Sequence, residues 1–217
     1  MFVADRMSRP VITVPPTLPI QDALSLMRKE KVSRLPVVDR RGRLVGIVSE
    51  KDLLHAAPSS ATSLSVWELS YLLSKVTVEE IMTRQVITIS GDTPIEEAAR
   101  VMSDNSIHGL PVMKKSEVVG MITANDIFRL FLELLGAREP GVRMTILVRN
   151  IPGEYSRITR AIFDAGGNIV ALSQFLGEST ENRHAILKVE GVDELTLRKV
   201  VTPLVVRLVD SRTMKPG

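Results

Sequence analysis

The same pair of polar side chains, a hydroxyl followed three residues later by a carboxylate, occurs twice along the chain. Ser49 precedes Asp52, and Thr123 precedes Asp126, each where an apolar run meets a helical pattern. Free backbone N–H groups and the dipole at a helix start favour a phosphate, and a carboxylate in the first turn can accept two hydrogen bonds from a ribose diol. This spacing favours a ligand with sugar and phosphate groups. The sequence leaves open the alternative that these residues only cap the helices.

Both motifs belong to an internal repeat with an offset of 75 residues, from Met7 to Met82. The aligned segments are 7–14 with 82–89, 35–38 with 110–113 and, after the loss of one residue in a loop, 46–49 with 120–123. Apolar, Gly, Pro and Asp positions stay in step throughout. The repeat therefore predicts two structural units of the same kind.

Each copy predicts the element order β-α-β-β-α. In the first helix Ile20, Ala23, Leu24 and Met27 lie at i, i+3, i+4 and i+7, which is one helical face. The expected strands are 11–14, 34–38 and 44–48 in the first copy and 86–89, 109–113 and 117–122 in the second. The expected helices are 19–30 and 50–56, then 94–104 and 124–135. Residues 57–76 form a linker with its own helix, opened by a capping box at Ser65 and Glu68.

Each copy resembles a CBS domain: a Met-Ser/Thr start, a Val-Ile-Thr segment, a Leu-Pro-Val strand, and a Gly three residues before Ser/Thr-x-x-Asp. Together the two copies resemble a CBS pair, or Bateman module, over roughly residues 1–137. The resemblance implies an adenosine-containing ligand (AMP, ADP, ATP, NAD or S-adenosylmethionine) in pockets that both repeats share. It also implies that Arg34 and His108 stand at aligned positions whose residues, in related modules, approach the phosphates and the edge of the adenine ring.

Two such pockets are expected. The first joins Arg34, Ile47, Ser49 and Asp52 to Ile87, Ile107, His108 and Gly109. The second joins Met121, Thr123 and Asp126 to Ile12, Val32, Ser33 and Arg34. Gly109 stands in the second copy where the first has Arg34, so the two pockets are expected to differ in charge.

The C-terminal third predicts the order β-α-β-β-α-β, a split ferredoxin-like arrangement. Its expected strands are 143–149, 168–176, 183–189 and 204–209, with helices near 155–165 and 193–201. The turn 149–155 and the segment 165–169 resemble an ACT domain, expected over 142–212. The resemblance implies an effector site between two copies of the chain, lined by Asn150, Ile151, Gly153, Asn168 and Ile169. Asn150 and Tyr155 depart from the common ACT pattern, and both amino-acid sensing and simple dimerisation remain open.

The composition and the absence of metal-binding and catalytic motifs exclude several classes of function. The 217 residues carry a net charge of +3 and no cysteine, which excludes thiol chemistry and a disulfide framework. The charges of Asp5 and Arg6 near the start are not expected in a signal peptide, and there is no apolar stretch long enough for a membrane and no long basic run in the sequence. We therefore expect a cytoplasmic protein without a nucleic-acid partner. The three histidines fall in different parts of the chain, and we expect no metal site, no required cofactor and no catalytic residues.

The expected architecture is α+β: CBS repeats at 1–56 and 77–137, a linker at 57–76, and an ACT domain at 142–212. This combination resembles the acetoin-utilisation B-type family. The favoured function is a homodimeric regulator that senses an adenine nucleotide and acts on a metabolic enzyme. The alternatives are a structural dimerisation adaptor with empty pockets and a nucleotide-hydrolysing enzyme.

Overall fold

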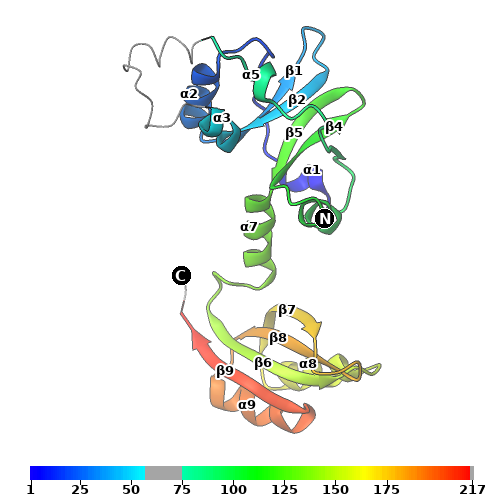
Figure 1. Ribbon diagram of the computed structural model, residues 1–217. Coiled ribbons are helices and arrows are strands. Elements are labelled where there is room, and N and C mark those ends of the chain that lie inside the picture. The colour runs from blue at the N-terminus through cyan, green and yellow to red at the C-terminus, as the bar shows by residue number, and fades with distance from the viewer. Residues whose placement is uncertain (57–74, 216–217) are drawn as a thin grey trace. The chain divides into compact units, whose positions relative to one another are not determined.

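The computed structural model describes residues 1–56 and 75–215. These form two compact units, Met1–Ile127 and Phe128–Gly217 (Figure 1). The linker helix expected near Ser65 and Glu68, with Trp67 and Tyr71, lies outside the described residues. No helix in the described parts of the chain is both long and apolar enough to cross a membrane.

The first repeat consists of two helices packed on a two-stranded antiparallel sheet. Its elements are α2 (Ile20–Glu30), β1 (Arg34–Val38), β2 (Leu44–Ser49) and α3 (Glu50–Ala56). The predicted face of α2 provides Ile20, Ala23 and Met27 to a core that also contains Leu35 and Val48. Burial of this apolar face holds α2 against the sheet.

The second repeat has the same elements and one strand more. Its elements are β3 (Ile89–Ser90), α6 (Ile95–Asp104), β4 (Gly109–Lys114), β5 (Glu117–Thr123) and α7 (Ala124–Leu134). The order in its sheet is β3-β4-β5, with β3 parallel to β4. The helices and the two long strands match the boundaries predicted from the sequence to within one residue.

The predicted first strand of each repeat is shorter in the structure, and this is a correction. In the first repeat only Val14 forms a bridge, to Val37, whereas the second repeat has the two-residue strand β3. Pro15 and Pro16 follow Val14 directly and have no N–H to donate, so the pairing cannot extend beyond Val14, and residues 11–13 before it form no ladder with β1.

The segments that open the two repeats are exchanged. Helix α1 (Val3–Arg6) opens the first repeat but bonds to the second, with Val3 N donating to Thr93 O at 2.9 Å. Helix α5 (Val78–Ile81) opens the second repeat but bonds to the first, with Val78 N donating to Leu18 O at 2.9 Å. Val78 and Met82 accordingly belong to the core of the first repeat. The exchange joins the repeats into one unit.

The second unit is a four-stranded antiparallel sheet with two helices on one face (Figure 1). Its elements are β6 (Gly141–Arg149), α8 (Glu154–Asp164), β7 (Asn168–Leu176), β8 (Asn182–Glu190), α9 (Glu194–Val201), a 3₁₀ turn (Thr202–Leu204) and β9 (Arg207–Met214). The strand order is β7-β8-β6-β9. The elements follow the predicted order, but β9 begins three residues later than expected because the 3₁₀ turn occupies residues 202–204.

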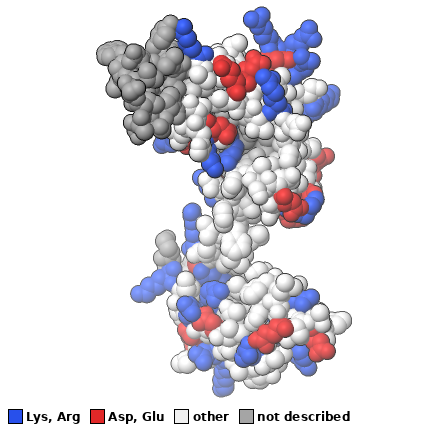
Figure 2. Space-filling view, in the orientation of Figure 1, with Lys and Arg blue, Asp and Glu red and all other residues white. Residues whose placement is uncertain are grey.

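Alternate residues of β6 and β8 face the helices and form the core of this unit with Ile158 and Ile162 of α8 and Leu197 and Val201 of α9. On the surface, basic side chains gather over the turn between β1 and β2 with acidic ones beside them (Figure 2). Elsewhere on the visible face both signs are interspersed.

Candidate functional site

One cavity of the first unit, about 370 Å³ in volume, contains all eight residues of the first predicted pocket. The first repeat provides Arg34, Ile47, Ser49 and Asp52, and the second provides Ile87, Ile107, His108 and Gly109. The exchange of opening segments explains this meeting, because Thr83 pairs with Ile47 through two backbone hydrogen bonds of 3.0 and 2.9 Å. The segment after Thr83 is thereby held beside the end of β2.

Ser49 and Asp52 form a reciprocal cap at the start of α3. Asp52 Oδ2 accepts hydrogen bonds from Ser49 N at 2.8 Å and from Ser49 Oγ at 2.7 Å. Asp52 Oδ1 has no hydrogen-bond partner among the described residues, although both side chains line the cavity. The capping role is therefore present, and it leaves one carboxylate oxygen available as an acceptor.

Arg34 and Gly109 occupy equivalent positions in the two sheets. Arg34 lies opposite Ser49 in one ladder, and Gly109 lies opposite Thr123 in the other. A Cβ on Gly109 would lie 3.2 Å from Arg34 Cδ, so the glycine makes room for the arginine. Burial lowers the pKa of Arg34, and the charge of Asp52 partly opposes this shift. The guanidinium stays a cation at neutral pH, because an arginine pKa starts well above that range.

Five further lining residues were missed by the sequence analysis. They are Lys51, Thr83, Gln85, Val86 and Ser106. Most are sequence neighbours of residues that were identified, and the repeat alignment pointed to the segment 82–89. The family resemblance already placed Ile87 of this segment in the shared pocket, but nothing in the sequence indicated which of its neighbours also line the cavity.

Contacts in the structure connect only some of the residues that were expected in the second pocket. Thr123 and Asp126 repeat the cap, with Thr123 Oγ1 donating to Asp126 Oδ2 at 2.6 Å. Met121 N and O exchange backbone hydrogen bonds with Ser8 at 3.3 and 2.8 Å. Ile12 and Val32 pack against the core of the first repeat, and Ser33 Oγ accepts from Arg34 Nη1 at 3.2 Å. Arg34, which the sequence assigns to both expected pockets, lines the first cavity.

The expected effector residues of the second unit lie at opposite ends of α8 within one chain. Asn150 N donates to Glu181 O at 2.7 Å, and Asn150 Nδ2 donates to Thr180 O at 3.0 Å, beside the β7–β8 turn. Asn168 instead pairs with Glu190 at the far end of β8. Ile151 and Gly153 lie with Asn150, and Ile169 lies with Asn168. The contacts therefore do not bring the two groups of expected effector residues together within one chain.

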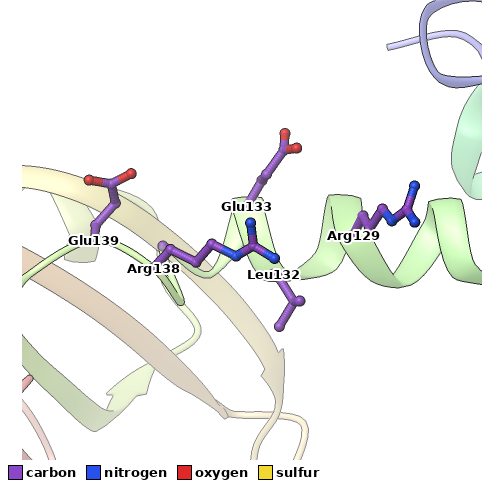
Figure 3. A pocket seen from close by; sticks show the side chains of 6 residues that line it. Arg129, Leu132, Glu133, Arg138 and Glu139 are labelled. Atoms are coloured by element: carbon purple, nitrogen blue, oxygen red, sulfur yellow. The ribbon is translucent and has the colours of Figure 1, made fainter. Parts of the chain in front are cut away.

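Another hollow of the second unit, about 290 Å³, lies at the end of α7. Its labelled side chains carry both charges, as Arg129, Glu133, Arg138 and Glu139 (Figure 3). Figure 3 shows that they point in different directions and do not converge on one point. In the described residues no group of three or more His, Asp or Glu side chains could hold a metal ion.

Comparison with known proteins gives related chains for the first unit. L-aspartate semialdehyde sulfurtransferase of Methanocaldococcus jannaschii is 38% identical over 131 residues, which are 60% of this chain and 23% of that enzyme. A CBS domain-containing protein of Dictyostelium discoideum is 32% identical over 136 residues, which are 62% of this chain and 94% of that protein. This chain thus spans about a quarter of the enzyme that it matches and nearly all of the smaller protein.

Two solved structures agree with these sequence matches. The CBS domain pair of protein MJ0100, in complex with 5′-methylthioadenosine and S-adenosyl-L-methionine, is 37% identical with a TM-score of 0.51, covering 60% of this chain and 95% of that one. The Vibrio cholerae protein described as an acetoin utilization protein (AcuB) is 32% identical with a TM-score of 0.52, covering 64% of this chain and 96% of that one.

The CBS domain model matches residues 3–59 and 78–133, which together are more than half of the chain. These segments contain both repeats, both Ser/Thr-x-x-Asp motifs and every residue of the cavity between them. The chain belongs to the CBS domain family, with its two CBS domains arranged in tandem.

Proposed function

We propose that this chain is a cytoplasmic, non-enzymatic regulatory protein that binds an adenosine-containing ligand in the cavity between its CBS domains. The observation that carries the proposal is the convergence of Asp52 and Arg34 from one repeat with His108 from the other on one cavity. The bound adenosine compounds of the MJ0100 CBS pair support the ligand class.

The lining chemistry favours a ligand that also carries phosphate. Asp52 Oδ1 accepts a ribose hydroxyl while Oδ2 keeps the cap with Ser49. The cations Arg34 and Lys51 line the same cavity, so a phosphate gains charge-assisted hydrogen bonds there. Ile47, Ile87 and Ile107 provide apolar walls for an adenine ring. AMP, ADP and ATP fit this set better than an uncharged nucleoside.

We also propose the domain limits 1–56, 77–137 and 142–212, with an ACT domain of ferredoxin-like fold as the last of these. The strand order β7-β8-β6-β9 and the helices α8 and α9 support this assignment. The separation of Asn150 from Asn168 along α8 supports an effector site that two copies build together. Amino-acid sensing and dimerisation alone are both compatible with that arrangement.

A homodimer formed through the CBS helices belongs to the same proposal. Helix α7 exposes Phe128, Phe131 and Leu132, whose exposed fractions are 66%, 54% and 40%. Their spacing of i, i+3 and i+4 places them on one face of the helix. An apolar helix face of this kind is typical of a subunit interface, and it also motivates the alternative of an adaptor that binds no ligand.

Regulation requires that the ligand bind two conformations with different affinity. A cavity with walls from two repeats meets this requirement, because closing the repeats on a ligand changes the number of its contacts. The proposed output is a change in the activity of a partner enzyme.

Thermal unfolding with AMP, ADP, ATP, adenosine, NAD, S-adenosylmethionine and amino acids tests the proposal. A ligand at 100 times its Kd adds about 2.7 kcal/mol to the free energy of unfolding. We expect a higher Tm with a phosphate-bearing adenosine compound, and a loss of that increase in Arg34→Gln. A folded protein whose Tm responds to no compound, together with a tight dimer in light scattering, would favour the adaptor.

A further inference from the structure

Two arginines of the second unit meet at a buried carboxylate. Glu154 opens α8, and its side chain is 1% exposed. Arg149, at the end of β6, donates Nε to Glu154 Oε1 at 3.1 Å and Nη2 to Oε2 at 3.4 Å. Arg157, one turn along α8, donates Nη2 to Oε2 at 2.8 Å. The shared carboxylate holds guanidinium groups from two different elements side by side.

The charges of this cluster do not cancel. Burial by itself raises the pKa of Glu154, but the hydrogen bonds and charges of Arg149 and Arg157 outweigh it and keep that pKa below its usual value. Glu154 is therefore ionised at neutral pH, and the three side chains together carry one positive charge. Both arginine side chains are 51% exposed, so this charge is open to a ligand.

Each guanidinium also keeps donors that the protein does not use. Arg149 donates to Glu154 through Nε and one hydrogen of Nη2. Arg157 donates through Nη2 to Glu154 and to Leu204 O, the latter at 3.5 Å. Within residues 1–56 and 75–215, Nη1 of Arg149 and both Nε and Nη1 of Arg157 have no hydrogen-bond partner. An arginine has five N–H donors, so each side chain has at least two left.

A cavity of about 290 Å³ lies against these two arginines. Its other walls are Pro203, Leu204, Val205 and Val206, which lead from the 3₁₀ turn into β9. This cavity contains none of the predicted effector residues Asn150, Ile151, Gly153, Asn168 and Ile169. Its lining therefore differs from that of the expected effector site, although Arg149 and Glu154 are sequence neighbours of Asn150 and Gly153.

The geometry points to a binding site for a phosphoryl group, either inorganic phosphate or a small phosphate monoester, between Arg149 and Arg157. A tetrahedral phosphate has oxygens for two guanidiniums that come from different directions, whereas a carboxylate offers only two oxygens in one plane. The aliphatic side chains of Leu204 and Val206 give a wall for the organic part of a monoester. The net charge of the cluster favours a dianion over a neutral molecule.

The test uses the full chain with Arg34→Gln and Lys51→Gln, which together remove both cations proposed for phosphate in the CBS cavity and keep the two sites distinguishable. Inorganic phosphate, phenyl phosphate and acetate are titrated by calorimetry and by the Nε–H NMR signals of the arginines, at constant ionic strength. We expect saturable binding of phosphate, with shifts of Arg149 and Arg157, and no saturation with acetate. Tighter binding of phenyl phosphate would identify the monoester as the preferred form.

Arg157→Gln should weaken phosphate binding at least about tenfold, because it removes charge-assisted hydrogen bonds. The matched control is Arg160→Gln, on the same helix but paired with Asp164 at 3.0 Å and absent from the cavity wall. Equal phosphate affinity in the two variants, or no saturable binding in the parent, overturns the proposal.

If Arg157→Gln does not fold, Arg149→Gln decides. This change removes the other guanidinium that lines the cavity and leaves Glu154 paired with Arg157, so phosphate should again bind at least about tenfold more weakly than in the parent. Unchanged affinity in folded Arg149→Gln overturns the proposal.

Discussion

The sulfur of Met82 lies 2.4 Å from the position that a Cβ on Gly46 would occupy. The same relationship recurs at the other end of the first unit, where Met7 Sδ lies 2.5 Å from the corresponding position on Gly120. Each methionine opens one repeat and packs on the middle of a strand of the other repeat. The absent side chain of the glycine is therefore what allows the two CBS domains to exchange their opening segments.

Gly46→Ala should lower the free energy of unfolding by about 1–3 kcal/mol, the range for overpacking a core. Gly120→Ala should carry a similar cost, because at both glycines the atoms nearest to the new Cβ belong to a methionine side chain, Met82 at residue 46 and Met7 at residue 120. Urea unfolding measures both. In a Met82→Ala background the further cost of Gly46→Ala should shrink, and a cost that stays the same would contradict the packing argument.

Asp52→Asn should weaken binding of AMP at least about tenfold, because an amide replaces the charged acceptor of a ribose hydroxyl. Asp126→Asn should have a smaller effect, since Asp126 does not line this cavity. Asp22→Asn, in the first turn of α2, is the control for a general loss of helix-start charge. Calorimetry with all three variants checks the order of affinities. Equal losses in Asp52→Asn and Asp126→Asn would show that the cavity is not the main site.

Glu154 should make the stability of the second unit depend on acid. Its pKa is lower in the folded protein than in the unfolded chain, so its stabilising contribution is fully present above the unfolded value of 4.5. That contribution is lost as the pH falls through the folded pKa. Urea midpoints between pH 7 and pH 3 should therefore fall less steeply in Glu154→Gln than in the parent. Parallel curves would mean that the ion pairs with Arg149 and Arg157 contribute no net stability.

Phe131→Glu should dissociate the proposed homodimer, because it places a charge in the apolar face of α7. The matched control is Phe163→Glu on α8, where the phenylalanine is 68% exposed and lies 5.4 Å beneath the Arg160 guanidinium. Light scattering should give a monomer for the first variant and the parent mass for the second. A dimer in both would place the interface elsewhere.

Much of the fold follows from local patterns in the sequence. The face of α2 and the ends of β1 are predicted correctly, because periods of 3.6 and 2 residues report which side of an element is buried. The predicted strand at residues 11–14 is wrong as a regular strand, because only Val14 pairs with the sheet, and a run of β-branched residues does not determine which backbone groups find a partner. Strand β9 begins later than predicted because Pro203 lies in a 3₁₀ turn. A helical pattern in the sequence does not distinguish such a turn from the end of an α-helix.

The candidate site likewise contains residues that the sequence identifies and residues that it does not. Ser49 and Asp52 are identified by their spacing, and the family resemblance adds His108 and Gly109. Lys51 and Gln85 were missed, because a lysine inside a helix start and a glutamine in a short segment have no signature of their own. Their place in the cavity depends on which repeat the segment after Met82 joins.

The sequence by itself determined the two repeats, their helices and strands, and the hydroxyl–carboxylate pair at each helix start. These features depend on contacts between residues that are close in the sequence, so the spacing of residue types is enough to predict them. Only the tertiary structure decided that Met82 packs on Gly46, that Thr83 pairs with Ile47, and that Arg149 and Arg157 share Glu154. Those contacts depend on the complementary shape and charge of surfaces on separate elements. The periodicity of the sequence within one element does not indicate which surfaces will meet.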